Sequence, residues 1–227
     1  MDHRRARRQL RVVARLLDRV YGRPRLTRLS DPLDELVGTI LSQNTSDTNS
    51  DRAYTRLREV FPTWEAVLAA PRSRIAATIR PGGLANIKTR RIKAALRWVR
   101  AQRGRLDLRF LRRLPLDEGR RVLEGLRGAG IGPKTAACVL LFACGKEAFP
   151  VDTHIHRVGK RLGLLGPCVT REQAHAVFET LISPGEAYPL HLNLIRHGRQ
   201  VCHARRPHCE RCVLLRHCPY GQRYGDR

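Results

Sequence analysis

The residues best suited to chemistry lie in a glycine-rich turn and in the helix expected to follow it. Residues 128–132 contain three glycines, a spacing that favours a tight hairpin whose backbone can approach a ligand closely. Pro133 suits the first turn of a helix, because its missing N–H would be unpaired there anyway. Lys134 is the only charged residue from there to Cys144. We therefore expect a lysine at the mouth of a buried, apolar helix.

This position gives Lys134 two candidate roles. The partial positive charge of a helix N-terminus and burial both make an ammonium ion release its proton more readily. A neutral lysine amine is a Schiff-base nucleophile. With five lysines among the 44 basic residues, 39 are arginines, so a lysine has been placed where only lysine could be a nucleophile. The alternative is a lysine that binds phosphate on a glycine hairpin, and this stretch alone does not decide between them.

A second candidate, Asp152, follows Lys134 by 18 residues and begins another expected helix. A helix over residues 134–144 rises roughly 15 Å, and the extended residues 145–151 can return up to ~23 Å. The carboxylate can therefore reach the lysine. Taken alone, however, an aspartate in this position indicates only an N-cap.

Four cysteines near the C-terminal end have the spacing C-x₆-C-x₂-C-x₅-C: Cys202, Cys209, Cys212 and Cys218. Four thiolates in one compact loop suit a [4Fe–4S] cluster. They also suit a tetrahedral zinc ion, for which two C-x₂-C pairs are more usual than the single one here. Arg205 and Arg206 lie between the first two cysteines and would give the loop a basic edge.

The composition indicates the partner and the compartment. A formal charge of +24 and a pI near 11.3 predict a polyanionic partner, nucleic acid first and an acidic membrane second. No apolar run is long enough to span a membrane, and we expect no membrane association. Seven cysteines without a signal peptide indicate a reducing cytosol and bound metal. We therefore expect a cytoplasmic protein.

Helical patterns fill the chain, and no alternating strand pattern of useful length occurs. We predict an all-α protein. The expected helices cover residues 6–20, 32–41, 47–60, 86–103, a stretch ending near 126, 134–144 and 153–162, with two short helices starting near residues 63 and 71.

These features together resemble the endonuclease III family of helix-hairpin-helix DNA glycosylases over nearly the whole chain. The resemblance rests on residues 130–136, on residues 151–155, on Leu41-Ser42 leading to Asp47, and on the four-cysteine loop. It implies two domains: a six-helix domain, residues 25–146, carrying the helix-hairpin-helix near 118–145, and an iron–sulfur domain, residues 1–24 plus 147–227. In the second domain a [4Fe–4S] cluster would occupy the loop 202–218, with damaged DNA lying between the domains.

By the same resemblance, Lys134 is the nucleophile, Asp152 the essential carboxylate, and the four cysteines the cluster ligands. Leu84 matches the apolar wedge that fills the stack after a base leaves it. The alternative is an ordinary loop leucine that packs under a helix. The implied DNA-contacting residues are Gln43, Asn44, Leu84, Gly130, Gly132, His154, Arg205 and Arg206. Asn44 stands where the family has a glutamine.

The function implied is a monomeric, bifunctional base-excision-repair glycosylase that acts on damaged double-stranded DNA. The resemblance also implies a protein of bacterial or archaeal type, associated with the nucleoid when it is on DNA. This glycosylase would remove oxidised pyrimidines through a lysine Schiff base and cut the strand by β-elimination. Adenine-mismatch relatives carry a catalytic glutamate where Thr39 stands, and thymine-mismatch relatives carry tyrosine in place of Lys134. The alternative is a weakly or non-catalytic DNA-binding iron–sulfur protein, because helix-hairpin-helix elements also serve purely as phosphate clamps.

Overall fold

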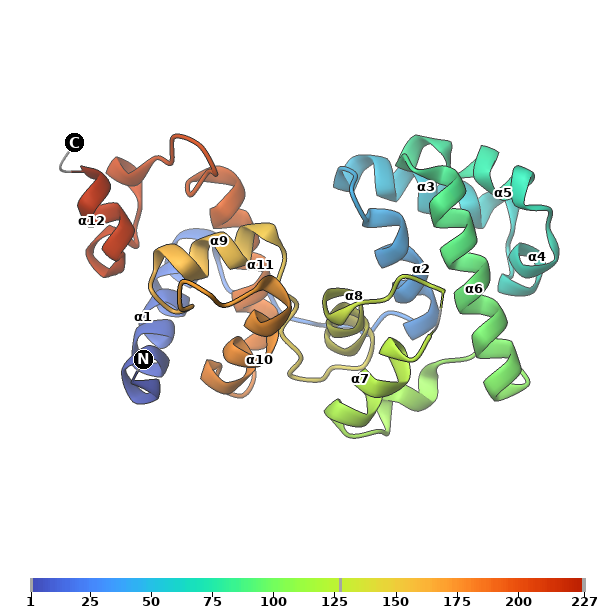
Figure 1. The fold of residues 1–227 in the computed structure, drawn as a ribbon, viewed down its shortest axis with the longest axis horizontal. Helices are drawn as coiled ribbons and strands as arrows, with labels where there is room; N and C mark the ends of the chain where they lie inside the picture. Colours follow the sequence, from blue (N-terminus) through green and yellow to red (C-terminus); the bar gives the residue numbers. More distant parts are fainter. Residues whose placement is uncertain (1, 127, 226–227) are drawn as a thin grey trace. The chain divides into compact units, whose positions relative to one another are not determined.

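The computed structural model describes residues 2–126 and 128–225, and within these ranges the chain forms helices and loops without any strand (Figure 1). The prediction of an all-α protein is confirmed. Residues 1, 127, 226 and 227, which belong to the predicted domains and hairpin, lie outside the described residues.

The chain divides into two compact units. The central unit is Arg28–Lys146, and the terminal unit combines Met1–Thr27 with Glu147–Arg227. Lys134 belongs to the central unit, whereas Asp152 and the four-cysteine loop belong to the terminal unit.

The central unit is built around a helix that is apolar on most of its surface. The helices of the central unit are α2 (Pro32–Ser42), α3 (Asp47–Val60), α4 (Trp64–Ala69), α5 (Arg72–Thr78), α6 (Ala85–Arg103), α7 (Leu116–Glu124) and α8 (Pro133–Cys138). Short turns η1 (Arg80–Gly82), η2 (Arg109–Arg112) and η3 (Val139–Ala143) complete it. α2 packs against α3, α6, α8 and η3, so its side chains form the centre of the core. As predicted, Asp31 caps α2, accepting hydrogen bonds from the N–H groups of Leu33 and Asp34.

The terminal unit joins the two ends of the chain. It contains α1 (His3–Tyr21), α9 (Thr153–Arg161), α10 (Arg171–Leu181), α11 (Ala187–Gln200), η4 (Cys209–Arg211), η5 (Leu215–His217) and α12 (Pro219–Gly225). α11 packs against both α1 and α9. Phe149 and Phe178 stack in the core with their ring centroids 4.8 Å apart. The N-terminal helix therefore depends on the C-terminal part of the chain for its apolar partners.

In the part of the chain that the structure describes, no helix has the length and apolar character needed to cross a membrane.

Candidate functional site

Lys134 lies in the first turn of α8, directly after the glycine hairpin. Gly132 is the N-cap and Pro133 the first helical residue, as the sequence predicted. The Lys134 side chain is half-buried, and the helix after it is buried. The α-helix ends at Cys138, and the chain continues as a π-helical turn to Ala143, where we predicted one helix to residue 144. Such π-turns are rare and often occur at functional sites.

Glu35 on α2 is the acidic residue that the structure adds to the surroundings of Lys134. Its carboxylate accepts hydrogen bonds from the hydroxyls of Ser30, at 3.0 Å, and Thr39, at 3.3 Å. Burial raises the pKa of Glu35, while the two hydroxyls and the charge of Lys134 oppose that rise. Glu35 was not predicted from the sequence, because an acidic residue in the first turn of a helix is common. Its spacing of four residues from Thr39, on the same helix face, was the available signal.

The glycine hairpin is held by a hydrogen-bonded pair of side chains from α6 and from the loop after α2. Arg91 donates a short hydrogen bond to the Gln43 side-chain oxygen. The Gln43 amide in turn donates to the carbonyl of Gly130 and the hydroxyl of Thr135, both at 3.4 Å. The structure therefore brings Gln43 and Gly130 together. It also adds Arg91, which no feature of the sequence singled out from its basic neighbours.

The two predicted glycines of the hairpin have different surroundings. Gly130 has a φ of +63°, and a Cβ added there would lie 2.5 Å from the Arg91 Nε atom. Gly132 has a φ of −106°, and an added Cβ would meet nothing within 4 Å. Gly130 is therefore required by the fold, whereas the backbone at Gly132 is open to an incoming molecule.

Asn44 and Leu84 share an unusual backbone conformation. Their φ angles are +53° and +49°, in the left-handed region that non-glycine residues seldom adopt. Asn44 is exposed, and Leu84 retains 49% exposure although it is a leucine. A strained residue that keeps an apolar side chain in solvent is an observation from which function can be inferred.

In the terminal unit, Asp152 and His154 begin α9. The Asp152 Oδ1 atom accepts a hydrogen bond from the Ile155 N–H at 2.8 Å, so the expected N-cap is confirmed. The His154 Nδ1 atom lies 3.0 Å from an Arg157 nitrogen, and the His154 side chain packs on Gly198. The pairing of Asp152 with Lys134 stays a prediction.

The four predicted cysteine ligands line one pocket of the terminal unit. The Gly221 N–H donates to the Cys218 sulfur at 3.4 Å, and the Cys212 sulfur lies 3.5 Å from the His197 Nε2 atom. Burial raises the pKa of Cys212 to about 11, and the three other cysteines contribute to the rise. Four neighbouring thiolates repel one another, so a bound cation would favour their ionised form.

This arrangement bears on which metal group the cysteines fit. Among the residues that the structure describes, no group of three or more His, Cys, Asp or Glu side chains could hold a metal ion. A single zinc ion needs four sulfurs at about 2.3 Å from one point. In a [4Fe–4S] cluster each cysteine binds a different iron, so its sulfurs stand apart around a common space. The four thiols around one pocket match such a cluster in the type and number of ligands. Arg205 and Arg206 are exposed on this loop.

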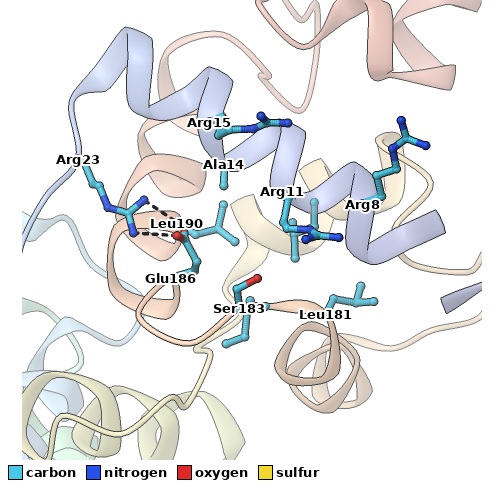
Figure 2. Close-up of a pocket in the computed structure, with 11 residues that line it drawn as sticks. Arg8, Arg11, Ala14, Arg15, Arg23, Leu181, Ser183, Glu186 and Leu190 are labelled. Atoms are coloured by element: carbon cyan, nitrogen blue, oxygen red, sulfur yellow. Dashed lines mark hydrogen bonds and ion pairs between the residues drawn. The ribbon is translucent and has the colours of Figure 1, made fainter. Parts of the chain in front are cut away.

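A separate groove of about 450 Å³ in the terminal unit contains none of the predicted site residues (Figure 2). Its one lining carboxylate, Glu186, pairs with Arg23 at 2.7 Å. Arg8, Arg11 and Arg15 of α1 also line the groove. Their charges contribute to the basic character of the chain.

The hairpin gives a matched pair of variants. Gly130→Ala places a methyl group against Arg91 in a left-handed backbone, so we expect it to lower the free energy of unfolding by at least about 1 kcal/mol. Gly132→Ala meets open space and should change it by no more than about 0.5 kcal/mol. Urea unfolding followed by circular dichroism measures both. Equal losses in the two variants would contradict the distinction.

Comparisons with known proteins agree with this arrangement. The model of the HhH-GPD superfamily of base excision DNA repair proteins matches residues 37–184. A putative DNA glycosylase of Arabidopsis thaliana is 39% identical over 75% of this chain, and the match spans 57% of that relative. Endonuclease III of Sulfolobus acidocaldarius is 36% identical over 82% of this chain and 80% of its own. A solved structure of a trapped endonuclease III–DNA covalent intermediate superposes with a TM-score of 0.80, at 27% identity, over 96% of this chain and 98% of its own.

The family match covers more than half of the chain and includes the glycine hairpin, Lys134 and Asp152. The chain belongs to the HhH-GPD superfamily of base excision DNA repair proteins, as an endonuclease III-like DNA glycosylase with AP lyase activity.

Proposed function

We propose that this glycosylase and AP lyase removes oxidised pyrimidines from double-stranded DNA through a Schiff base on Lys134. The observation that carries the proposal is a half-buried lysine directly after a glycine hairpin, at the start of a buried helical segment. The similarity to an endonuclease III that was trapped as a covalent DNA intermediate supports it. The protein would act as a monomer with two domains, residues 25–146 and residues 1–24 with 147–227.

In the proposed reaction, the neutral amine of Lys134 attacks C1′ of the deoxyribose, and the damaged base leaves with the electrons of the glycosidic bond. Asp152 stabilises the positive charge that develops on the sugar and accepts the proton that the lysine loses. The sugar ring opens to give an iminium ion between Lys134 and C1′. A proton then leaves C2′, the bond between C3′ and its phosphate oxygen breaks, and water later releases the lysine.

The proposed contacts with DNA follow from which groups are exposed. The open backbone at Gly132 allows a phosphate to approach the start of the helical segment 133–143, where the positive end of the helix dipole favours an anion. Leu84 enters the base stack, and Asn44 faces the space left by the extruded base. His154, Arg205 and Arg206 contribute further contacts, which position the duplex without reading its sequence.

The proposal includes a [4Fe–4S] cluster held by Cys202, Cys209, Cys212 and Cys218. The endonuclease III family is generally associated with an iron–sulfur cluster. When bound, the cluster supplies a redox centre and joins the two ends of loop 202–218. Loop 202–218 also carries Arg205 and Arg206. An ordered loop therefore supports the proposed DNA contacts of these arginines, independently of any redox role of the cluster.

Borohydride trapping tests the nucleophile. Borohydride reduces an iminium ion to a stable amine, so wild-type protein should form a covalent adduct with a duplex that contains an abasic site or thymine glycol. Lys134→Ala should abolish the adduct, because no other amine replaces it. Lys146→Ala is the matched control, a half-buried lysine of the same unit, and should retain the adduct. Unchanged trapping in Lys134→Ala would refute the assignment, and a wild type without any adduct would favour the DNA-binding alternative.

Asp152→Asn separates the proposed catalytic role from the N-cap. Asparagine caps a helix about as well as aspartate, so the free energy of unfolding should change by no more than about 0.5 kcal/mol. Loss of the negative charge should reduce the rate of base excision by about 10²–10⁴-fold. Single-turnover kinetics and urea unfolding measure the two effects. A variant as active as the wild type would show that Asp152 is only a cap.

The cluster prediction concerns the purified protein. We expect a yellow-brown protein with broad visible absorbance and about four irons per chain. Cys212→Ser should lose this absorbance and the iron. Cys168→Ser, which replaces an exposed cysteine outside the pocket, should keep both. A colourless wild type with one zinc ion per chain would contradict the assignment.

A further inference from the structure

We propose that Lys88 is a positioning residue that holds Leu84 and Asn44 at a fixed separation, so that base extrusion depends on its buried ammonium group. The inference rests on the proposed function, because it explains what fixes the positions of Leu84 and Asn44, two residues proposed to contact DNA. Lys88 itself contacts neither DNA nor the reacting atoms in this proposal.

Lys88 is among the largest fully buried side chains of the structure, with 1% of its surface exposed. Lysine is rarely buried to this extent unless its charge is satisfied. The Lys88 Nζ atom donates two hydrogen bonds of 2.6 Å, one to the carbonyl of Leu41 and one to the carbonyl of Gly82. Burial lowers the pKa of Lys88, and the charge of Arg91 lowers it further, so these bonds must offset an unfavourable environment.

The two carbonyls belong to the two segments that carry the exposed residues. Leu41 lies in the last turn of α2, three positions before Asn44. Gly82 ends the turn η1, two positions before Leu84. Each carbonyl therefore belongs to a residue two or three positions before one with a left-handed backbone. One ammonium group connects the two segments, and movement of either would leave a buried donor unsatisfied.

The surroundings leave the Gly82 segment little freedom. A Cβ added at Gly82 would lie 3.0 Å from the Ala53 Cβ atom of α3, so the turn packs closely on that helix. On its other side, the Leu84 carbonyl accepts a hydrogen bond from the Lys88 N–H at 2.9 Å. The backbone of Lys88 thus binds Leu84, and the side chain of the same lysine binds Gly82, two positions before it. Strained backbone persists only where neighbouring contacts determine it in this way.

A cation suits this place better than a neutral donor. The Leu41 carbonyl is one of the last carbonyls of α2, which have no partner within the helix and lie at its negative end. Hydrogen bonds from a charged donor are roughly twice as strong as neutral ones. A positive charge therefore joins the end of α2 to the turn η1 more firmly than a neutral side chain could.

Lys93 on the same helix provides a matched control. It is also buried, with 6% exposure, and its Nζ atom donates to the carbonyl of Ala70. Ala70 lies between α4 and α5, away in sequence from both Asn44 and Leu84. Lys88→Met and Lys93→Met each replace a buried ammonium group by a thioether of similar length. Both variants should be less stable than the wild type, but only Lys88→Met should disturb the positions of Leu84 and Asn44.

The experiment compares the two variants with the wild type at a temperature where circular dichroism shows all three folded. Base extrusion is followed by the fluorescence of 2-aminopurine placed opposite thymine glycol, and chemistry by single-turnover cleavage. For Lys88→Met we expect the fluorescence rise to be lost and base excision to slow by about tenfold or more, because extrusion costs a few kcal/mol. Cleavage at a preformed abasic site, which has no base to extrude, should change by less than about threefold. Lys93→Met should change neither rate by more than about threefold.

Several results would overturn the inference. Equal effects of Lys88→Met and Lys93→Met would reduce Lys88 to a stability residue, as would a loss of abasic-site cleavage as large as the loss of excision. If Lys88→Met does not fold, Lys88→Gln, which keeps an amide donor, is tested by the same criteria. A wild type that gives the 2-aminopurine fluorescence rise without cleaving would refute the proposed function, and a loss of that rise in Lys88→Met alone would still support the positioning role.

Discussion

Cationic side chains of one helix, bound to buried carbonyl and amide oxygens, organise the central unit. Lys88 donates to the carbonyls of Leu41 and Gly82, and Arg91 donates to the Gln43 side chain while it packs on Gly130. These contacts tie α6 to the end of α2, to the turn before α6 and to the hairpin. A charge without such partners would be costly to bury. The separations between these three segments are therefore set by bonds that cannot be stretched without leaving a charge unsatisfied.

This constraint explains how strained residues persist in the same unit. Asn44 and Leu84 have positive φ angles, and each lies within three positions of a residue bonded by the Lys88 side chain of α6. Left-handed backbone costs a leucine about 1–2 kcal/mol. Helix α6 supplies the rigid support against which such conformations are held. Exposed groups placed on rigid elements are preorganised for a ligand, because little freedom remains to be lost on binding.

Local features of the sequence predicted much of this architecture. Asp31-Pro32 predicted the start of α2, and the apolar run after Lys134 predicted a buried helix. These features depend on neighbours along the chain, which a sequence displays directly. The burial of Lys88 and Lys93 was not predicted, because both lie in a basic helix whose pattern is typical of a solvated surface. Lys88 binds Leu41, 47 positions away, in addition to the nearby Gly82, and Lys93 binds Ala70, 23 positions away. No local rule specifies the two distant contacts. Glu35 differs, because its two hydroxyl partners lie only four and five positions away and its neighbour Lys134 alone is distant along the chain.

The contacts of Gln43 bear on which amide faces the DNA. The family resemblance places Asn44 where the family has a glutamine, which has a longer side chain. The neighbouring Gln43 could in principle take the role of that glutamine. Both polar ends of Gln43 are already engaged, since its oxygen accepts from Arg91 and its nitrogen donates towards Gly130 and Thr135. Releasing it would leave the Arg91 guanidinium without this partner and would loosen the hairpin at a cost comparable to a charge-assisted hydrogen bond. Asn44 is exposed. In this chain the longer amide of Gln43 therefore supports the hairpin, and Asn44 is the amide of the two that stays exposed.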